Sequence, residues 1–231
     1  MTNGGAVLLT GFEAFGDSAT NPTARIVDLL DGADVLGRRI VGLELPVSTE
    51  RMPPLLAAAV DAHRPELVLS LGLANGRSML AVERVAVNVL DFPMPDNDGA
   101  QPIDQPVIPG APCAYFATAP VKSTLLAWAE AELPGYVSNS AGTYLCNATF
   151  FHSLHLGASS GHRAGLVHVP YLPEQAAALT HPARTGGRPL NMPVGGLPSM
   201  ALDAMLAAVR TAIEVSLTIH VDAVVGAGAV S

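Results

Sequence analysis

Hydrophobic and polar positions along the chain alternate between the spacing of strands and that of helices. Apolar runs of strand length occur at residues 6–10, 39–45 and 66–71. Helical spacing occurs between them, at residues 22–30 and 48–63. The first helix has a typical start, because Asn21 is a good N-cap and Pro22 suits the first helical position. The third apolar run is hydrophobic on both faces, as in a sheet covered by helices on both sides. This pattern predicts an α/β fold.

The alternation then changes. Residues 79–89 have a strand pattern that places Glu83 on one face together with three valines. A carboxylate on such a face is partly buried and needs a partner. Two kinds of partner remain open: an imidazole, His168, or a guanidinium, Arg77 or Arg84. Of the two arginines, Arg84 is expected on the opposite face of the strand.

The second half of the chain returns to helices and strands. Helices are predicted at residues 120–132, from residue 143 or 144 onward, and at residues 200–219. The proline-rich residues 91–112 form a surface excursion, and the glycine-rich residues 180–199 form either a lid or a connector without function. We therefore predict one α/β domain, residues 1–219, with an open twisted mixed sheet between helical layers, an α/β/α sandwich like those of phosphorylases and hydrolases. An apolar tail, residues 220–231, is predicted to be disordered or packed on a partner.

Composition and charge exclude several classes of protein. Hydrophobic residues make up 49% of the chain and charged residues 14%, which excludes a disordered protein and favours self-association. The formal net charge is −8 with no basic run, which argues against nucleic-acid binding. The N-terminus lacks the basic region of a secretion signal. In the apolar residues 200–219, Asp203, Arg210 and Glu214 lie on one helical face, so we expect this helix to pack on a core and not to span a membrane.

The two cysteines, Cys113 and Cys146, are too few for a disulfide framework and form no metal-type Cys-x-x-Cys pair. A reducing cytoplasm suits them best. Cys113 follows a proline in a loop and has no predicted histidine partner, so a passive or interfacial role is expected for it and not a catalytic one. Cys146 lies in the first turn of the helix that begins at residue 143 or 144. Unpaired N–H groups and the positive end of the helix dipole favour a thiolate there, although a small apolar core residue is the open alternative.

A second segment supports the functional interpretation of Cys146. An apolar run stops at Pro170 and places His168 near the carboxyl end of a buried strand, the edge where ligands bind in open α/β sheets. Cys146 and His168 could then meet as nucleophile and general base, and Glu83 could hold the other nitrogen of the imidazole. A core histidine bound to a backbone carbonyl is the structural alternative for His168.

Six segments in order resemble the pyrrolidone carboxyl peptidase family, also called pyroglutamyl peptidase type I, whose cysteine enzymes remove N-terminal pyroglutamate from peptides. The cysteine segment, Ser-Ala-Gly-Thr-Tyr-Leu-Cys-Asn, is the most specific. The six segments lie at residues 10–16 with 21–22, 45–47, 82–88, 95–97, 140–147 and 168–175. Together they span nearly the whole chain.

The resemblance implies a catalytic triad of Glu83, Cys146 and His168 on an open α/β sandwich, with a thioester intermediate and no metal or other cofactor. It also implies a cytoplasmic homo-oligomer, a tetramer or a dimer, with N-terminally pyroglutamylated peptides as substrates. By the same resemblance, the ring pocket is lined by a further set: Phe12, Phe15, Asn21, Tyr144 and Leu145. Aromatic faces can enclose the methylenes of a compact, uncharged lactam. The phenylalanines could instead be core residues, and Asn21 could only cap its helix.

Two departures from the family pattern stand out. Where the family commonly has Gly-Gln-Ala-Gly-Gly-Arg, this chain has Leu73 and Asn75 at the second and fourth positions. An arginine that the family places near its active site is replaced by Pro93. Arg77 or backbone amides would have to compensate for the missing guanidinium. A binding module that has lost efficient catalysis therefore stays open beside the peptidase. A nucleoside phosphorylase-like enzyme is disfavoured, because no glycine-rich phosphate loop is evident.

Overall fold

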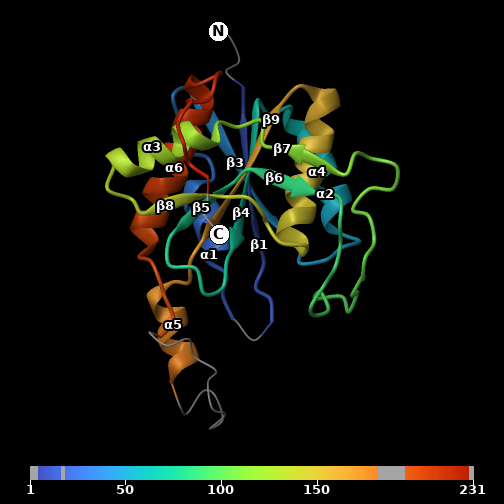
Figure 1. Cartoon of the computed structure of the whole chain (residues 1–231). Helices are drawn as coiled ribbons and strands as arrows, with labels where there is room; N and C mark the ends of the chain where they lie inside the picture. The colour runs from blue at the N-terminus through green and yellow to red at the C-terminus, as the bar shows by residue number, and fades with distance from the viewer. Residues whose placement is uncertain (1–4, 17–18, 182–195, 229–231) are drawn as a thin grey trace.

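The computed structural model describes residues 5–16, 19–181 and 196–228. A seven-stranded sheet in the order β2-β3-β1-β4-β9-β5-β8 forms the centre (Figure 1). Its strands are β1 (Val7–Phe12), β2 (Asp34–Val35), β3 (Arg38–Leu45), β4 (Leu67–Leu73), β5 (Leu80–Glu83), β8 (Gly135–Ser138) and β9 (Arg163–Val169). The helices are α1 (Pro22–Leu30), α2 (Met52–His63), α3 (Val121–Glu130), α4 (Leu145–Ser160), α5 (Pro173–Thr180) and α6 (Leu202–Thr218). This arrangement confirms the predicted α/β sandwich with a mixed sheet.

Two helical layers cover the sheet, because each strand presents apolar side chains to both faces. Helices α1, α3 and α6 pack on one face, and α2 and α4 on the other (Figure 1). Trp128 of α3 is fully buried in the first layer, where its indole N–H donates to the carbonyl of Ala208 at 2.9 Å. Phe150 and Phe151 of α4 are fully buried in the second layer. Trp128 thus joins α3 to α6, and the two phenylalanines fix α4 against the sheet.

The strand directions decide which residues share a face. Strands β3, β1, β4 and β9 are parallel, so their carboxyl ends lie at one edge. Strand β5 runs antiparallel to β9 and places Ala81 opposite His168. Because side chains two residues apart in a strand share a face, Glu83 lies on the same face as His168 and diagonally across from it. The sheet register therefore brings this carboxylate and this imidazole together.

The strand predicted over residues 79–89 is wrong in its extent. The chain breaks after Glu83, and a separate strand, β6 (Val85–Val87), pairs antiparallel with β7 (Ala114–Phe116) in a second, two-stranded sheet. The single valine face assumed for Glu83 therefore does not exist. A period-two pattern cannot reveal the break, because both pieces keep the same alternation.

Some helices of the structure also differ from those predicted from the sequence, for local reasons. Helix α2 begins at Met52 and not at residue 48, because the hydroxyl of Ser48 accepts the N–H of Arg51 in a turn before the helix. Helix α5, which starts with a proline at its first position, was not predicted. Most of the loop predicted at residues 180–199 lies outside the described residues. None of the helices that the structure describes is long and apolar enough to cross a membrane.

Part of the predicted C-terminal tail packs on its own chain. The carboxylate of Asp222 accepts the backbone N–H groups of Val121, Lys122 and Ser123 at 2.8–3.0 Å, at the start of α3. Burial opposes the charge of Asp222, but these N–H bonds hold its pKa below the usual value. The residue at the N-cap position of α3 is a proline with no side-chain bond, so Asp222 caps this helix from about a hundred residues away in sequence.

Candidate active site

Cys146 is the second residue of α4 and is partly exposed. The chain reaches it through a tight turn in which Gly142 adopts a φ of 77°, a conformation that other residues rarely adopt. Tyr144 occupies the N-cap position without a side-chain hydrogen bond to the helix. The first-turn N–H groups of a helix have no acceptor within it, and Cys146 lies in the first turn of α4. This placement agrees with the sequence-based position of Cys146.

His168 lies near the carboxyl end of β9 and is only 4% exposed. Its neighbour across the parallel ladder is Gly72 of β4. A Cβ atom at Gly72 would lie 2.7 Å from Nε2 of His168 and 2.8 Å from Sγ of Cys146. The thiol and the imidazole therefore converge on the space above this glycine, and any side chain there would collide with both.

Glu83 is fully buried and holds the other nitrogen of the imidazole. Its Oε1 atom lies 2.7 Å from Nδ1 of His168. The same oxygen also accepts a hydrogen bond of 2.9 Å from Nη1 of Arg77. The two partners considered from the sequence, an imidazole and an arginine, are thus both present. Arg84 follows Glu83 directly, but it lines a separate groove with Phe116.

The electrostatics of His168 follow from these contacts. Burial opposes a positive charge on the ring, but hydrogen bonds to Cys146 and Glu83, and the charges of both, raise the pKa of His168 to about 9. An imidazole held between a carboxylate and a thiol can carry a proton and pass it on. The three side chains therefore form a set able to support nucleophilic chemistry at sulfur.

We expect His168 to keep its proton up to about pH 9. A pKa above the ordinary value means that the ring is charged below pH 9 and neutral above it, so chemistry that needs the imidazolium should fall off above that pH. His152 provides an internal control, because burial and the charge of His155 lower its pKa to about 4. An NMR titration of the histidine rings between pH 5 and 10 checks this. A midpoint for His168 near 6.5 would contradict the geometry.

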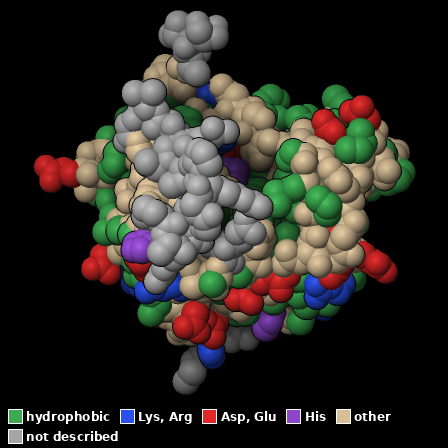
Figure 2. Space-filling view, turned by 90° about the horizontal axis from the view of Figure 1, so that it is seen from below, with side chains coloured by type: hydrophobic (Ala, Val, Ile, Leu, Met, Phe, Trp, Pro, Cys, Tyr) green, Lys and Arg blue, Asp and Glu red, His purple; other side chains and the backbone are tan. Residues whose placement is uncertain are grey.

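An apolar pocket opens beside Cys146. Figure 2 views the molecule from the side where β1, β4 and β9 end, and shows hydrophobic side chains along one side of a hollow there. The pocket is lined by Phe12, Phe15, Asn21, Val47, Leu73, Tyr144, Leu145 and Cys146. All five residues expected at a ring pocket are among them. Val47 and Leu73 were not predicted as pocket residues from the sequence, although Val47 lies in one of the six matching segments and Leu73 at a departure from the family pattern.

Asn21 combines the two roles considered for it. Its Oδ1 atom accepts the N–H of Thr23 at 3.0 Å and so caps α1. Its Nδ2 atom donates to the carbonyl of Glu13 at 3.0 Å. Both ends of the amide are therefore engaged by the protein, and Asn21 presents a fixed surface to the pocket.

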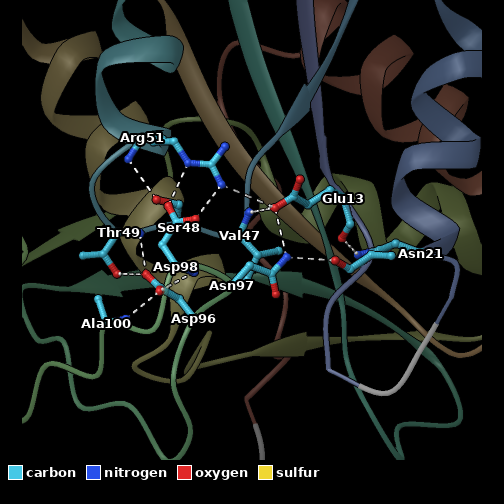
Figure 3. Close-up of polar contacts among 11 residues, drawn as sticks. Glu13, Asn21, Val47, Ser48, Thr49, Arg51, Asp96, Asn97, Asp98 and Ala100 are labelled. Carbon is cyan, nitrogen blue, oxygen red and sulfur yellow. Dashed lines mark hydrogen bonds and ion pairs between the residues drawn. The ribbon is translucent and has the colours of Figure 1, made fainter.

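A polar network outside the pocket ties together the segments that line it (Figure 3). Oε1 of Glu13 accepts the N–H of Val47 and an N–H of Asn97, each at 2.9 Å. Asn97 also donates its backbone N–H to the carbonyl of Val47 at 2.9 Å. Arg51 forms two hydrogen bonds with the carboxylate of Asp98, at 2.7 and 2.9 Å. We call Glu13, Arg51, Asn97 and Asp98 the brace, because they join segments far apart in sequence.

The loop that carries the brace also holds Tyr144. The hydroxyl of Tyr144 donates to the carbonyl of Pro95 at 3.1 Å, and its ring lies 4.3 Å from that of Phe92. Burial and the nearby charges of Asp96 and Cys146 raise the pKa of Tyr144 to about 12, so it remains a donor at neutral pH. One pocket wall is thus held from behind by residues 92–98.

Replacing Asn97 by alanine should weaken substrate binding more than it slows the chemical step. The change removes the donor that links Glu13 to the loop at residues 92–98, so Phe15 and Val47 lose part of their support. We expect KM to rise about 3- to 10-fold, the loss of one or two hydrogen bonds, with kcat nearly unchanged. Steady-state kinetics separate the two constants. A fall in kcat at constant KM would show that the brace does not act on the pocket.

Within the described part of the chain, no group of three or more His, Cys, Asp or Glu side chains is arranged to hold a metal ion.

Comparison with known proteins agrees with the motif-based resemblance. A family model described as pyroglutamyl peptidase matches residues 5–219. A pyrrolidone-carboxylate peptidase of Escherichia fergusonii is 43% identical over 224 residues, which cover 96% of this chain and 98% of the relative. One of Pyrococcus furiosus is 41% identical over 213 residues, 91% of this chain and 97% of the relative.

Solved structures agree with these matches. The pyrrolidone carboxyl peptidase from Thermococcus litoralis superposes with a TM-score of 0.84 at 39% identity, over 92% of this chain and 93% of that one. A mutant of the Pyrococcus furiosus enzyme gives a TM-score of 0.85 at 40% identity, over 92% and 98% of the two chains. The resemblance drawn from the six segments is therefore confirmed, and the chain belongs to the pyroglutamyl peptidase family of hydrolases.

Proposed function

We propose that this protein is a cysteine exopeptidase that removes N-terminal pyroglutamate from peptides through a thioester intermediate. The observation that carries the proposal is the convergence of Cys146 and His168 above Gly72, with Glu83 behind the imidazole and an apolar pocket beside the sulfur. The relatives named above are pyrrolidone-carboxylate peptidases, which supports the same substrate class.

In the proposed reaction, His168 holds the proton of Cys146 as an imidazolium, and the thiolate Sγ attacks the carbonyl carbon of the pyroglutamyl residue. The oxyanion that forms lies near the first-turn N–H groups of α4, which can stabilise it. The bond to the peptide nitrogen then breaks, and the leaving amine takes the proton from His168. Water, activated by the same imidazole, hydrolyses the thioester and releases pyroglutamate and the free thiol. Glu83 keeps Nδ1 of His168 protonated throughout.

The pocket suits a small neutral ring. Phe12, Phe15 and Tyr144 present apolar faces that can enclose the lactam methylenes, and backbone groups can pair with its N–H and C=O. Proline has a similar shape but carries a charged amine and lacks the ring oxygen. A dry pocket should therefore reject a prolyl residue.

The loss of an arginine at Pro93 bears on how the oxyanion is stabilised. The guanidinium of Arg77 donates to Glu83 and to the carbonyl of Ser140, and it does not line the pocket. We therefore assign this stabilisation to the backbone N–H groups at the start of α4 and not to a side-chain cation.

Hydrolysis of pyroglutamyl-aminocoumarin by the wild-type protein under reducing conditions tests the function, with prolyl-aminocoumarin as the matched control. We expect turnover of the first substrate and a rate at least about 100-fold lower for the second, because the pocket would leave a charged amine unpaired. Folded protein with no turnover, but with a melting temperature raised by pyroglutamate, would favour the binding module instead. Equal turnover of both substrates would contradict the proposed pocket.

We also propose that the protein works in the cytoplasm as a homo-oligomer, a dimer or a tetramer. Exposed apolar side chains support self-association: Phe116, Val221 and Val224 are 72%, 84% and 97% exposed. Both cysteines are free thiols, which suits a reducing compartment. Sedimentation velocity of the purified protein measures the assembly, and a monomer at every concentration would contradict it.

A further inference from the structure

Arg77 lies in the loop between β4 and β5, outside the pocket, and joins two parts of the candidate site. Nη1 donates to Oε1 of Glu83 at 2.9 Å, and Nη2 donates to the carbonyl of Ser140 at 3.4 Å. Its guanidinium carbon also lies 5.9 Å from the centre of the Tyr136 ring. Ser140 belongs to the turn that leads to Cys146. One side chain thus connects the buried carboxylate to the segment that carries the sulfur.

Glu83 depends on this contact. Its side chain is fully buried, and Oε1 accepts from both Arg77 and His168. Within the described residues, Oε2 has no hydrogen-bond partner. A buried carboxylate is costly unless it is paired. The two partners of Oε1, Arg77 and His168, therefore offset the cost of burying the charge of Glu83. Without Arg77, only His168 would remain to fix the position of Glu83.

We propose that Arg77 is a positioning residue: it holds Glu83 so that Oε1 faces His168, and its charge sets the pH range over which the pair of Cys146 and His168 is reactive. This inference rests on the proposed function, because the reactive pair is the one that would attack a pyroglutamyl carbonyl. It adds a role for a residue that touches neither the thiol nor the pocket.

The charge of Arg77 determines the direction in which the pH range shifts when this residue is removed. The reactive form holds a thiolate, an imidazolium and the Glu83 carboxylate, and Arg77 balances this set to zero net charge. Among the described residues, the ionisable groups that act on His168 are Glu83 from β5 and Cys146 from α4. The charge of Cys146 also acts on Tyr144, the residue before α4, and Tyr136 from β8 lies against the guanidinium of Arg77. Removing a positive charge makes it harder for the site to lose protons. Without Arg77, the pH at which the thiolate of Cys146 forms and the pH at which the imidazolium of His168 loses its proton should therefore both rise.

The rate at which iodoacetamide alkylates Cys146 as a function of pH tests this inference without relying on peptidase activity. A Cys113→Ser background removes the other thiol, which is exposed. In Arg77→Gln, the midpoint of the alkylation profile should rise by about half a pH unit or more. Arg77→Lys keeps the charge and should return the midpoint toward that of the wild type. Arg84→Gln removes a neighbouring charge that lines a separate groove, so its midpoint should not move.

Turnover of pyroglutamyl-aminocoumarin by the same variants completes the test. Arg77→Gln should lower kcat/KM about 10- to 100-fold at neutral pH, with the loss in kcat, as expected for one charge-assisted hydrogen bond. An unchanged alkylation profile in Arg77→Gln, or the same shift in Arg84→Gln, would overturn the inference. If the wild type hydrolyses no pyroglutamyl substrate while Arg77→Gln still shifts the alkylation profile, the proposed function fails and the role of Arg77 in the ionisation of the pair stands.

Discussion

Replacing Cys146 by serine should abolish hydrolysis of pyroglutamyl substrates. A serine hydroxyl is a far weaker nucleophile than a thiolate, and His168 cannot form a stable ion pair with it. We expect kcat to fall by at least about 10⁴-fold, since removing the nucleophile from a coupled set of catalytic residues costs about 10⁶-fold in a serine protease. The rate of amine release from pyroglutamyl-aminocoumarin measures the effect.

The fold should tolerate this change, because Cys146 is partly exposed and serine is close to it in size. Cys113→Ser is the matched control. Cys113 is the other free thiol. It is exposed and does not line the pocket, so this variant should keep the wild-type rate. Full activity of the Cys146→Ser protein would contradict the assignment of Cys146 as the nucleophile.

Replacing Glu83 by glutamine should have the second-largest effect. Nδ1 of His168 would then face an uncharged amide, and Arg77 would lose the negative charge it now pairs with. An imidazolium that lacks its carboxylate is less stable, and the ring can adopt the wrong tautomer. We expect kcat to fall about 10²- to 10⁴-fold, with little change in KM because Glu83 does not line the pocket.

The same substitution should lower the pKa of His168 from about 9 toward its ordinary value, since Glu83 is one of the groups that raise it. The high-pH limit of kcat/KM should move down accordingly, whereas the loss of Arg77 moves it up. Glu66→Gln is the control, because Glu66 forms a half-exposed ion pair with Arg38 and such pairs contribute little. A Glu83→Gln protein whose pH profile matches the wild type would contradict the assigned role.

Local patterns in the sequence were sufficient to locate the candidate site. Gly142 and the helical spacing after residue 144 indicate where α4 starts, and the apolar run that ends at Pro170 indicates where β9 stops. Since both signals lie within a few residues of Cys146 and His168, they place the two side chains at one edge of the sheet. The structure has the three proposed catalytic residues together, and their roles remain a prediction.

The partners of Glu83 required the fold. The sequence offered His168 and Arg77 as alternatives, because a one-dimensional pattern cannot show that one oxygen serves both. The antiparallel pairing of β5 with β9 sets this geometry, and the direction of a strand is not encoded in its alternation of apolar residues. The break after Glu83 was missed for the same reason.

The brace was not predicted either. Glu13 and Asn97 are 84 residues apart, and nothing in their local sequence indicates that they meet. Asp222 at the start of α3 is a similar case, about a hundred residues away from the N–H groups it caps. Polar contacts of this kind depend on how the loops pack, so they can be found only after the fold is known.

The measurement that tests the central claim most directly is labelling with a pyroglutamyl chloromethyl ketone, followed by peptide mapping and an assay of the remaining turnover. The account predicts one label per chain, on Cys146, with turnover lost in proportion to labelling and protection by free pyroglutamate. Cys113 should stay unlabelled. Full turnover in protein whose Cys146 is completely labelled, or loss of turnover with the label on Cys113 alone, would contradict the claim that Cys146 is the nucleophile of a pyroglutamyl peptidase.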